Sequence, residues 1–104
     1  MKARVWISRQ ARSQALQARP WWRENRPSAP GLFAQELAVV QSLLATAPEL
    51  GRPYHESSIP SLRRLLMKQT RYHVYYVYEA QRGEVVVLAI WSAVCGRAPK
   101  LRVL

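Results

Sequence analysis

The sequence predicts an α+β fold, in which a helical hairpin covers one face of a small, largely antiparallel sheet. A strand-like segment opens the chain, two helix-like segments follow it, and three strand-like segments fill most of the second half. Helices and strands are thus segregated along the chain, which is typical of α+β domains. Because 104 residues suffice for one modest core and not for two, residues 1–104 are expected to form a single domain.

The N-terminal third predicts a strand, a helix and the start of a second helix. Residues 3–8 (ARVWIS) are rich in β-branched and aromatic residues, as in strands. Residues 9–19 (RQARSQALQAR) consist of good helix formers. Pro20 is expected to end or kink this helix, because proline lacks an N–H group and clashes with the preceding turn. Ser28 is predicted to cap the second helix, with Pro30 in its first turn.

The second helix carries the clearest periodic pattern of the chain. Four apolar residues recur at intervals of four, three and four, which places them on one side of a helix. Pro48 and Gly51 are expected to end the helix, and residues 51–61 are predicted to form a loop. The apolar stripe consists of Phe33, Leu37, Val40 and Leu44.

The second half of the chain predicts three strands, at residues 62–68, 71–79 and 84–91. Residues 81–83 provide a short turn, so the last two strands should form an antiparallel hairpin. The predicted sheet is a three-strand antiparallel meander joined by the N-terminal strand, whose place in the sheet the pattern leaves open. Residues 95–104 form a basic C-terminal tail.

Composition excludes several classes of function. Sixteen Lys and Arg face six acidic residues, all of them Glu, and the net charge is +10. The lack of Asp removes Ser-His-Asp triads and Asp-rich two-metal centres. Cys95 is the single cysteine and His55 and His73 are the two histidines, so we expect no disulfide, no metal and no cofactor. The longest apolar run (85–91) is too short to span a membrane, and we expect a cytoplasmic protein.

The segment 71–79 holds four of the five tyrosines, and neither of its faces is clearly polar. Alternate residues of a strand face opposite sides. One face should pack on the helices, while tyrosine suits a second face that is partly solvated. The two sets are Tyr72, Val74, Tyr76 and Tyr78 on one side, and His73, Tyr75, Val77 and Glu79 on the other.

His73 permits two interpretations. Beside Arg64, Lys68 and Arg71 it has the cations that cleavage of RNA through the 2′-hydroxyl requires, with His73 moving protons. One histidine does not make an acid–base pair, however. A basic sheet face that docks on an acidic surface or a phosphate backbone needs no such pair.

The first helix and the tryptophans that follow it form a second candidate region. Its arginines are offset locally by Glu24 alone, so an acidic partner is one interpretation and a solvated helix face the other. Trp21 and Trp22 are adjacent, so we expect one to be buried and the other to be partly exposed. Packing of both at the corner of the helical hairpin is the favoured interpretation, and an exposed anchor for a partner is the alternative. The arginine series consists of Arg9, Arg12, Arg19, Arg23 and Arg26.

The order of elements and several local motifs resemble the RelE/ParE superfamily of bacterial toxins from type II toxin–antitoxin operons, over about residues 3–101. Residues 33–51 (FAQELAVVQSLLATAPELG) resemble its helix ending in L-x-x-x-P-x-x-G, and an Arg follows at 63 or 64. Residues 72–76 (YHVYY) resemble its Tyr-Arg-Val-x-Tyr strand. Residues 88–101 (LAIWSAVCGRAPKL) resemble the ending of a ParE-like branch.

The resemblance implies a growth-inhibiting toxin that a cognate antitoxin neutralises. ParE-like members poison DNA gyrase, and RelE-like members are ribosome-dependent mRNA endonucleases. His73 stands where the family often has Arg, and the chain after Trp91 has neither Tyr nor His, so we favour the gyrase class. The runner-up is an mRNA interferase, and a third interpretation is an RNA-binding module that stacks bases on tyrosines.

Each interpretation assigns its own residues. The interferase would use Arg64, Lys68, Arg71 and His73. Gyrase binding is assigned to Arg63, Arg64, Arg71, His73, Arg97, Lys100 and Arg102. Antitoxin binding is assigned to Trp21 and Trp22.

Overall fold

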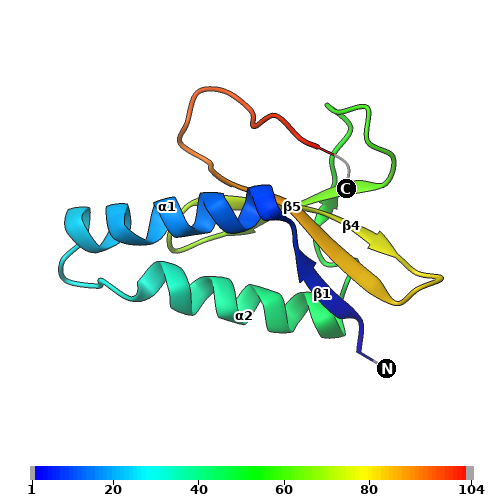
Figure 1. Cartoon of the computed structure of the whole chain (residues 1–104), viewed down its shortest axis with the longest axis horizontal. Helices are drawn as coiled ribbons and strands as arrows, with labels where there is room; N and C mark the ends of the chain where they lie inside the picture. The colour runs from blue at the N-terminus through cyan, green and yellow to red at the C-terminus, as the bar shows by residue number, and fades with distance from the viewer. Residues whose placement is uncertain (1, 103–104) are drawn as a thin grey trace.

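The computed structural model describes residues 2–102 and confirms the α+β prediction (Figure 1). Met1, Val103 and Leu104, which belong to the predicted domain and tail, lie outside the described residues. Two helices pair with one mixed sheet of five strands. The elements are β1 (Arg4–Ile7), α1 (Arg9–Asn25), α2 (Leu32–Thr46), β2 (Arg52–Pro53), β3 (Leu62–Met67), β4 (Tyr72–Glu79) and β5 (Glu84–Ser92).

The sheet has the strand order β1-β5-β4-β3-β2. The predicted meander of β3, β4 and β5 is antiparallel throughout, which confirms the hairpin at residues 81–83. β1 pairs in parallel with β5 and forms the edge of the sheet opposite β2. This long-range pairing gives the position of the N-terminal strand, which the sequence pattern did not predict. The prediction that residues 51–61 are all loop was wrong at Arg52 and Pro53, because this short stretch pairs with β3.

Pro20 was expected to end or kink the first helix, and the first of these outcomes was wrong, since α1 continues to Asn25. Proline removes only one intrahelical hydrogen bond here, the one that the carbonyl of Leu16 would accept. Leu16 and Pro20 both lie on the exposed side of the helix, where water reaches that carbonyl. On the buried side, Ala18 and Trp22 pack into the core and hold both halves of α1 against it.

The start of α2 also differs from the prediction. The helix begins at Leu32 after Gly31, which provides no side-chain cap, so Ser28 and Pro30 lie in the connecting turns rather than at the cap and first turn. Trp22 stabilises this connection, because its indole N–H donates to the carbonyl of Ala29 at 2.9 Å. The predicted apolar stripe of α2 is confirmed by Phe33, Val40 and Leu44, which are buried, and Leu37, which packs on them.

The two faces of the sheet bury different side chains. The face toward the helices holds Val74 and Tyr76, whereas Tyr75 packs on the opposite, outer face, as the alternation predicts. A bulge beside Tyr75 and Tyr76 inserts Leu88 into β5, so Leu88 and Ala89 both join the outer cluster. The outer face was expected to be partly solvated; in fact part of it is covered by side chains from the loop after β2 and from the tail: Tyr54, Ile59 and Leu101.

Two polar joints fix α2 to the sheet. At its C-terminal end, the fully buried Tyr76 hydroxyl accepts the N–H of Gly51 at 2.8 Å. Arg63 donates to the carbonyl of Gly51 at 2.7 Å, so the same loop is held from two strands. Near its start, the Glu36 carboxylate accepts the N–H groups of residues 69 and 70 and the Thr70 hydroxyl, at 2.7–2.8 Å. The turn between β3 and β4 is thereby anchored to α2.

Candidate functional site

The outer face of the sheet carries a group of basic and aromatic side chains, which we call the outer-face cluster. Arg64 of β3 lies opposite Tyr75 of β4, and His73 lies two residues before Tyr75 on the same face. The Arg64 guanidinium carbon is 4.8 Å from the centre of the Tyr54 ring, and the Tyr54 and Tyr75 rings meet edge to face at 5.3 Å. The cluster consists of Tyr54, Arg64, Arg71, His73 and Tyr75.

The electrostatics of the cluster keep His73 neutral near pH 7. Burial lowers the pKa of His73 below its ordinary value, and the positive charges of Arg64 and Arg71 lower it further. Burial also raises the pKa of Tyr54, and the neighbouring Tyr75 and Glu56 add to that effect. A protonated phenol is a poor general base, whereas the neutral imidazole of His73 is the form that can accept a proton, so His73 is the one candidate base of the cluster.

Arg71 reaches the cluster from the turn between β3 and β4. It adopts a φ of 63°, a left-handed conformation that costs a non-glycine residue about 1 kcal/mol. Its carbonyl accepts the N–H of Ala93 at 2.7 Å, which ties this turn to the start of the tail. The arginine side chain is exposed and free to meet a partner from this conformation.

Two of the residues assigned from sequence lie elsewhere. Arg63 faces the helices, where its guanidinium binds the carbonyls of Glu49 and Gly51 at 3.2 and 2.7 Å. Lys68 lines a groove on the other side of the β3 edge. The structure therefore brings together Arg64, Arg71 and His73, and separates Arg63 and Lys68 from them.

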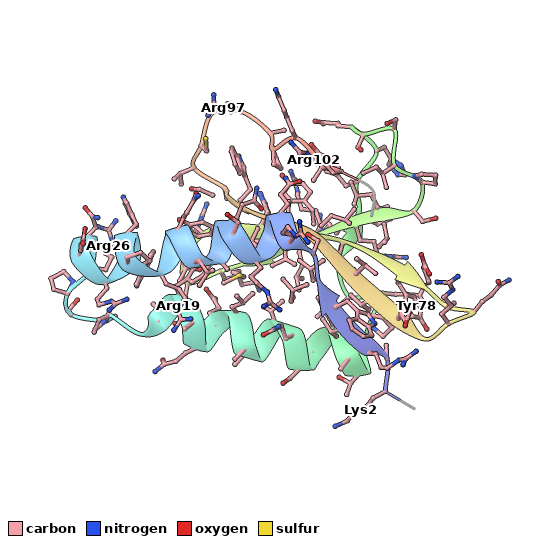
Figure 2. The ribbon with its side chains drawn as sticks, viewed as in Figure 1. Lys2, Arg19, Arg26, Tyr78, Arg97 and Arg102 are labelled. Atoms are coloured by element: carbon pink, nitrogen blue, oxygen red, sulfur yellow. The ribbon has the colours of Figure 1, made fainter. Side chains whose placement is uncertain are left out.

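The C-terminal tail crosses the outer side of the sheet through backbone and apolar contacts. The indole N–H of Trp91 donates to the carbonyl of Arg97 at 2.8 Å, and Gln10 donates to the carbonyl of Lys100. Leu101 packs against the outer cluster of the sheet. The side chains of Arg97, Lys100 and Arg102 remain exposed, so the tail presents its charges outward (Figure 2).

The tryptophan pair is divided between core and surface, as predicted, while a binding role for the exposed one stays a prediction. Trp22 is 8% exposed and sits in the helix-facing core, whereas Trp21 is 47% exposed. Trp21 lines a small pocket with Tyr72 and Trp91, at the junction of α1 with the end of β5. The Arg26 guanidinium lies 5.8 and 5.7 Å from the centres of the Trp21 and Trp22 rings.

An apolar groove of about 710 Å³ runs between α2 and β3, and sequence reasoning missed it. Its floor includes Leu65 and Met67 of β3, while Val39 and Leu43 of α2 form an exposed wall. The available signal was that α2 is apolar at positions 39 and 43, outside its buried stripe. We call this feature the α2–β3 groove.

The strand edge beside this groove is open. β2 pairs with β3 only at Arg63 and Arg64, so within residues 2–102 the edge of β3 from Leu65 to Met67 has no further partner strand. Such an edge presents unpaired N–H and C=O groups that an added strand can satisfy. Groove and edge lie side by side, so an apolar surface adjoins unpaired backbone groups of β3.

The described residues give no sign of a metal centre, since no three His, Cys, Asp or Glu side chains gather within residues 2–102. In the same range, no helix is long and apolar enough to cross a membrane.

Comparison with known proteins identifies the family. A family model described as the ParE toxin of the type II toxin–antitoxin system parDE matches residues 5–94. No curated protein matches the sequence. The chromosomal ParDE system of Pseudomonas aeruginosa contains a chain of similar structure, with a TM-score of 0.70 at 16% identity over 88% of this chain and 96% of that one.

Two further structures share the fold. A chain of the RelBE2 toxin–antitoxin complex of Mycobacterium tuberculosis gives a TM-score of 0.66 at 15% identity, over 88% of this chain and 99% of that chain. A mutant of the Escherichia coli toxin RelE in its free state gives 0.57 at 14% identity, over 92% of this chain and 88% of the other. Because the family model spans most of the sequence, this chain belongs to the ParE toxin family of type II toxin–antitoxin systems, within the RelE/ParE superfamily.

Proposed function

We propose that this toxin inhibits growth by binding and poisoning DNA gyrase through the outer-face cluster and the basic tail, without cleaving RNA. The observation that carries the proposal is that the outer-face cluster offers His73 no matched acid–base partner. Arg64 and Arg71 favour the neutral imidazole, which can accept a proton, but they are cations and cannot serve as the second titrating group. An acid–base cycle needs a second group whose pKa is matched to the first, and Tyr54 is shifted away from that range.

The arrangement suits docking on an acidic surface. Arg64 and Arg71 project from the sheet and its turn, and the tail adds Arg97, Lys100 and Arg102 as exposed charges. Clustered charges of one sign steer association with an oppositely charged partner. Tyr54 and Tyr75 add aromatic surface of the kind enriched in protein interfaces.

We further propose that the cognate antitoxin binds in the α2–β3 groove. The ParDE and RelBE2 structures are toxin–antitoxin systems, which supports a protein partner of this kind for the present chain. Val39, Leu43 and Leu50 line the groove and are 42–58% exposed, so an apolar segment would bury them. The open edge of β3 offers backbone hydrogen bonds, and Lys68 at the rim favours an acidic residue in the segment.

The runner-up is ribosome-dependent cleavage of mRNA. It is favoured by the proximity of Arg64, Arg71 and His73, which could bind a phosphate and stabilise its transition state. An RNA-binding module is less well supported, because the tyrosines of β4 are buried or half-buried and leave little ring surface for stacking bases.

The two target classes are separated by purified assays with four variants. Gyrase supercoiling should be inhibited by the parent chain and by His73→Ala, while mRNA on translating ribosomes stays intact. Deleting residues 97–104 should abolish inhibition, but this also removes Leu101 from the outer face. The triple change Arg97→Gln, Lys100→Gln and Arg102→Gln keeps Leu101 and should abolish inhibition as well. Codon-positioned mRNA cleavage that His73→Ala or Arg71→Ala abolishes, with gyrase unaffected, would establish the interferase instead.

The antitoxin proposal has a separate test. Co-expression with a short neighbouring reading frame that encodes an acidic, DNA-binding protein should give a stable complex and restore growth. Harmless accumulation of this chain alone, with no binding to that product, contradicts the assignment as an active toxin.

A further inference from the structure

The continuation of α1 through Pro20 creates a charged surface that a broken helix would not have. With 3.6 residues per turn, the side chains of Arg9, Arg12, Arg19 and Arg23 fall within an arc of about 80° on one side of the helix. They extend over about 21 Å at 1.5 Å per residue. We call these four residues the α1 arginine row.

The row is exposed and unpaired. All four arginines are exposed. In the part of the chain that the structure describes, the arginines that form ion pairs are Arg4, Arg63 and Arg82, none of which belongs to the row. Glu24 is the single acidic residue of α1 and pairs with none of them there. Like charges spaced four residues apart, as Arg19 and Arg23 are, destabilise a helix slightly. The fold therefore gains nothing from this row, and its charge is available to a partner.

The row lies on a different side of α1 from the aromatic residues. Arg19 and Arg23 border a pocket with Phe33 and Ala34 of α2, whereas Trp21 borders the pocket on the β5 side. Arg26 departs from the row, because its guanidinium lies over the Trp21 and Trp22 rings. Figure 2 shows Arg19 and Arg26 at the end of α1 that leads into the turn before α2.

The composition of the row indicates what kind of anion it fits. Tight protein interfaces bury an apolar centre. Among the large hydrophobic residues of α1, Leu16 and Trp21 are the exposed ones, and Leu16 alone falls within the arc of the row. Single-stranded nucleic acid binds by stacking on aromatic rings, and Trp21 faces the other way. Arginine forks match phosphate oxygens, and a rigid row of about 21 Å runs along roughly six base pairs of a duplex, at about 3.4 Å of helix axis for each phosphate of a strand.

We propose that the α1 arginine row binds the phosphate backbone of double-stranded DNA. This surface is separate from the outer-face cluster, and the proposal does not depend on gyrase, because DNA binding is measured on the isolated chain. Four phosphate contacts predict a slope of about −3.6 for log affinity against log salt, equivalent to a fall of about 150-fold between 50 and 200 mM salt.

The test compares two double variants that remove the same charge. Arg19→Gln with Arg23→Gln should halve the slope, so that affinity falls only about 12-fold over the same salt range. The control, Lys2→Gln with Arg82→Gln, changes exposed residues near β1 and the β4–β5 turn and should keep the parent slope. Binding is measured by fluorescence anisotropy with a short labelled duplex, and circular dichroism should show equal melting temperatures.

Three results overturn the proposal. One is an absence of duplex binding at 50 mM salt. Another is an equal loss in the two double variants, which would mean that only net charge matters. The third is tighter binding to poly-glutamate or to single-stranded RNA of matched charge, which would assign the row to an acidic protein or to RNA.

Discussion

Removing the hydroxyl of Tyr76 tests whether the tyrosine strand serves the fold. Tyr76 is fully buried on the helix-facing side of β4, and its hydroxyl accepts the N–H of Gly51 at 2.8 Å. Burial is the main reason that the pKa of Tyr76 is raised above its ordinary value. Tyr76→Phe keeps the ring and leaves the Gly51 N–H without its partner in a buried position.

An unsatisfied buried donor costs about 1–3 kcal/mol. For a chain of this size, each kcal/mol lowers the melting temperature by about 4–8 °C, so Tyr76→Phe should lower it by roughly 4–24 °C. Tyr76→Ala also leaves a cavity and should cost about 3 kcal/mol or more. Thermal and urea unfolding followed by circular dichroism measure these changes, with Tyr78→Phe, a half-buried tyrosine of the same face, as the control.

Gly51 supplies the other half of the test. A Cβ at this position would lie 2.8 Å from the Tyr76 hydroxyl oxygen and 3.1 Å from the Arg64 carbonyl oxygen, so Gly51→Ala should cost about 1–3 kcal/mol through overpacking. Combining it with Tyr76→Phe removes the contact with the hydroxyl oxygen, while the ring carbon Cε1 stays 2.9 Å from the added Cβ. The double variant should therefore lose less than the sum of the single losses, by at least about 0.5 kcal/mol.

The reasoning fails on either of two outcomes. If Tyr76→Phe melts within 1–2 °C of the parent, as the Tyr78→Phe control should, the buried hydrogen bond contributes little. If Tyr76→Phe is fully stable but no longer inhibits its target, Tyr76 belongs to the functional surface rather than to the core.

Three further predictions concern the functional surfaces. Because burial and the charges of Arg64 and Arg71 lower the pKa of His73, the unfolded chain binds this proton more tightly, and stability should fall as pH drops below about 6.5. His73→Gln should reduce the loss measured by urea unfolding between pH 7 and pH 5, and an unchanged loss contradicts the assignment. Leu43→Glu should weaken antitoxin binding at least tenfold in calorimetry, whereas Leu16→Glu, on α1, should not; equal effects would place the antitoxin elsewhere. Arg71→Gly relieves the left-handed strain and should keep the melting temperature at or above that of the parent while gyrase inhibition falls, and retained inhibition would remove Arg71 from the interface.

Local patterns were sufficient for the elements whose own residues decide them. The apolar stripe of α2 and the alternation around Tyr75 and Tyr76 each follow from repeats within one segment, and both are observed. The turn at Gly83 is likewise local, with a φ of 62° that glycine adopts readily. The family resemblance rested on the order of these elements, and the family model supports it.

Long-range packing decided the features that the sequence did not predict. α1 continues through Pro20 because Trp22 gains a buried position and a hydrogen bond to the Ala29 carbonyl, which outweighs one missing helical bond at an exposed site. β2 exists only through its pairing with β3. Predicting the α2–β3 groove would have required knowing which face of α2 meets the sheet, because Val39 and Leu43 look like core residues in the sequence alone.

The distribution of glutamates explains why so much positive charge is left at the surface. Three of the six join separate parts of the fold: Glu36 holds the turn before β4, Glu49 meets Arg63, and Glu84 binds both Arg4 and Trp6 across the β1 edge. A fourth, Glu79, pairs with Arg82 inside the β4–β5 turn. Most of the acidic residues thus pair within the fold rather than with the arginines of the binding surfaces. In the part of the chain that the structure describes, the arginines of the outer-face cluster, the tail and the α1 row form no ion pair with a glutamate. Neutralising Glu36 should therefore lower stability, whereas neutralising an arginine of those three surfaces should weaken binding and leave the fold intact.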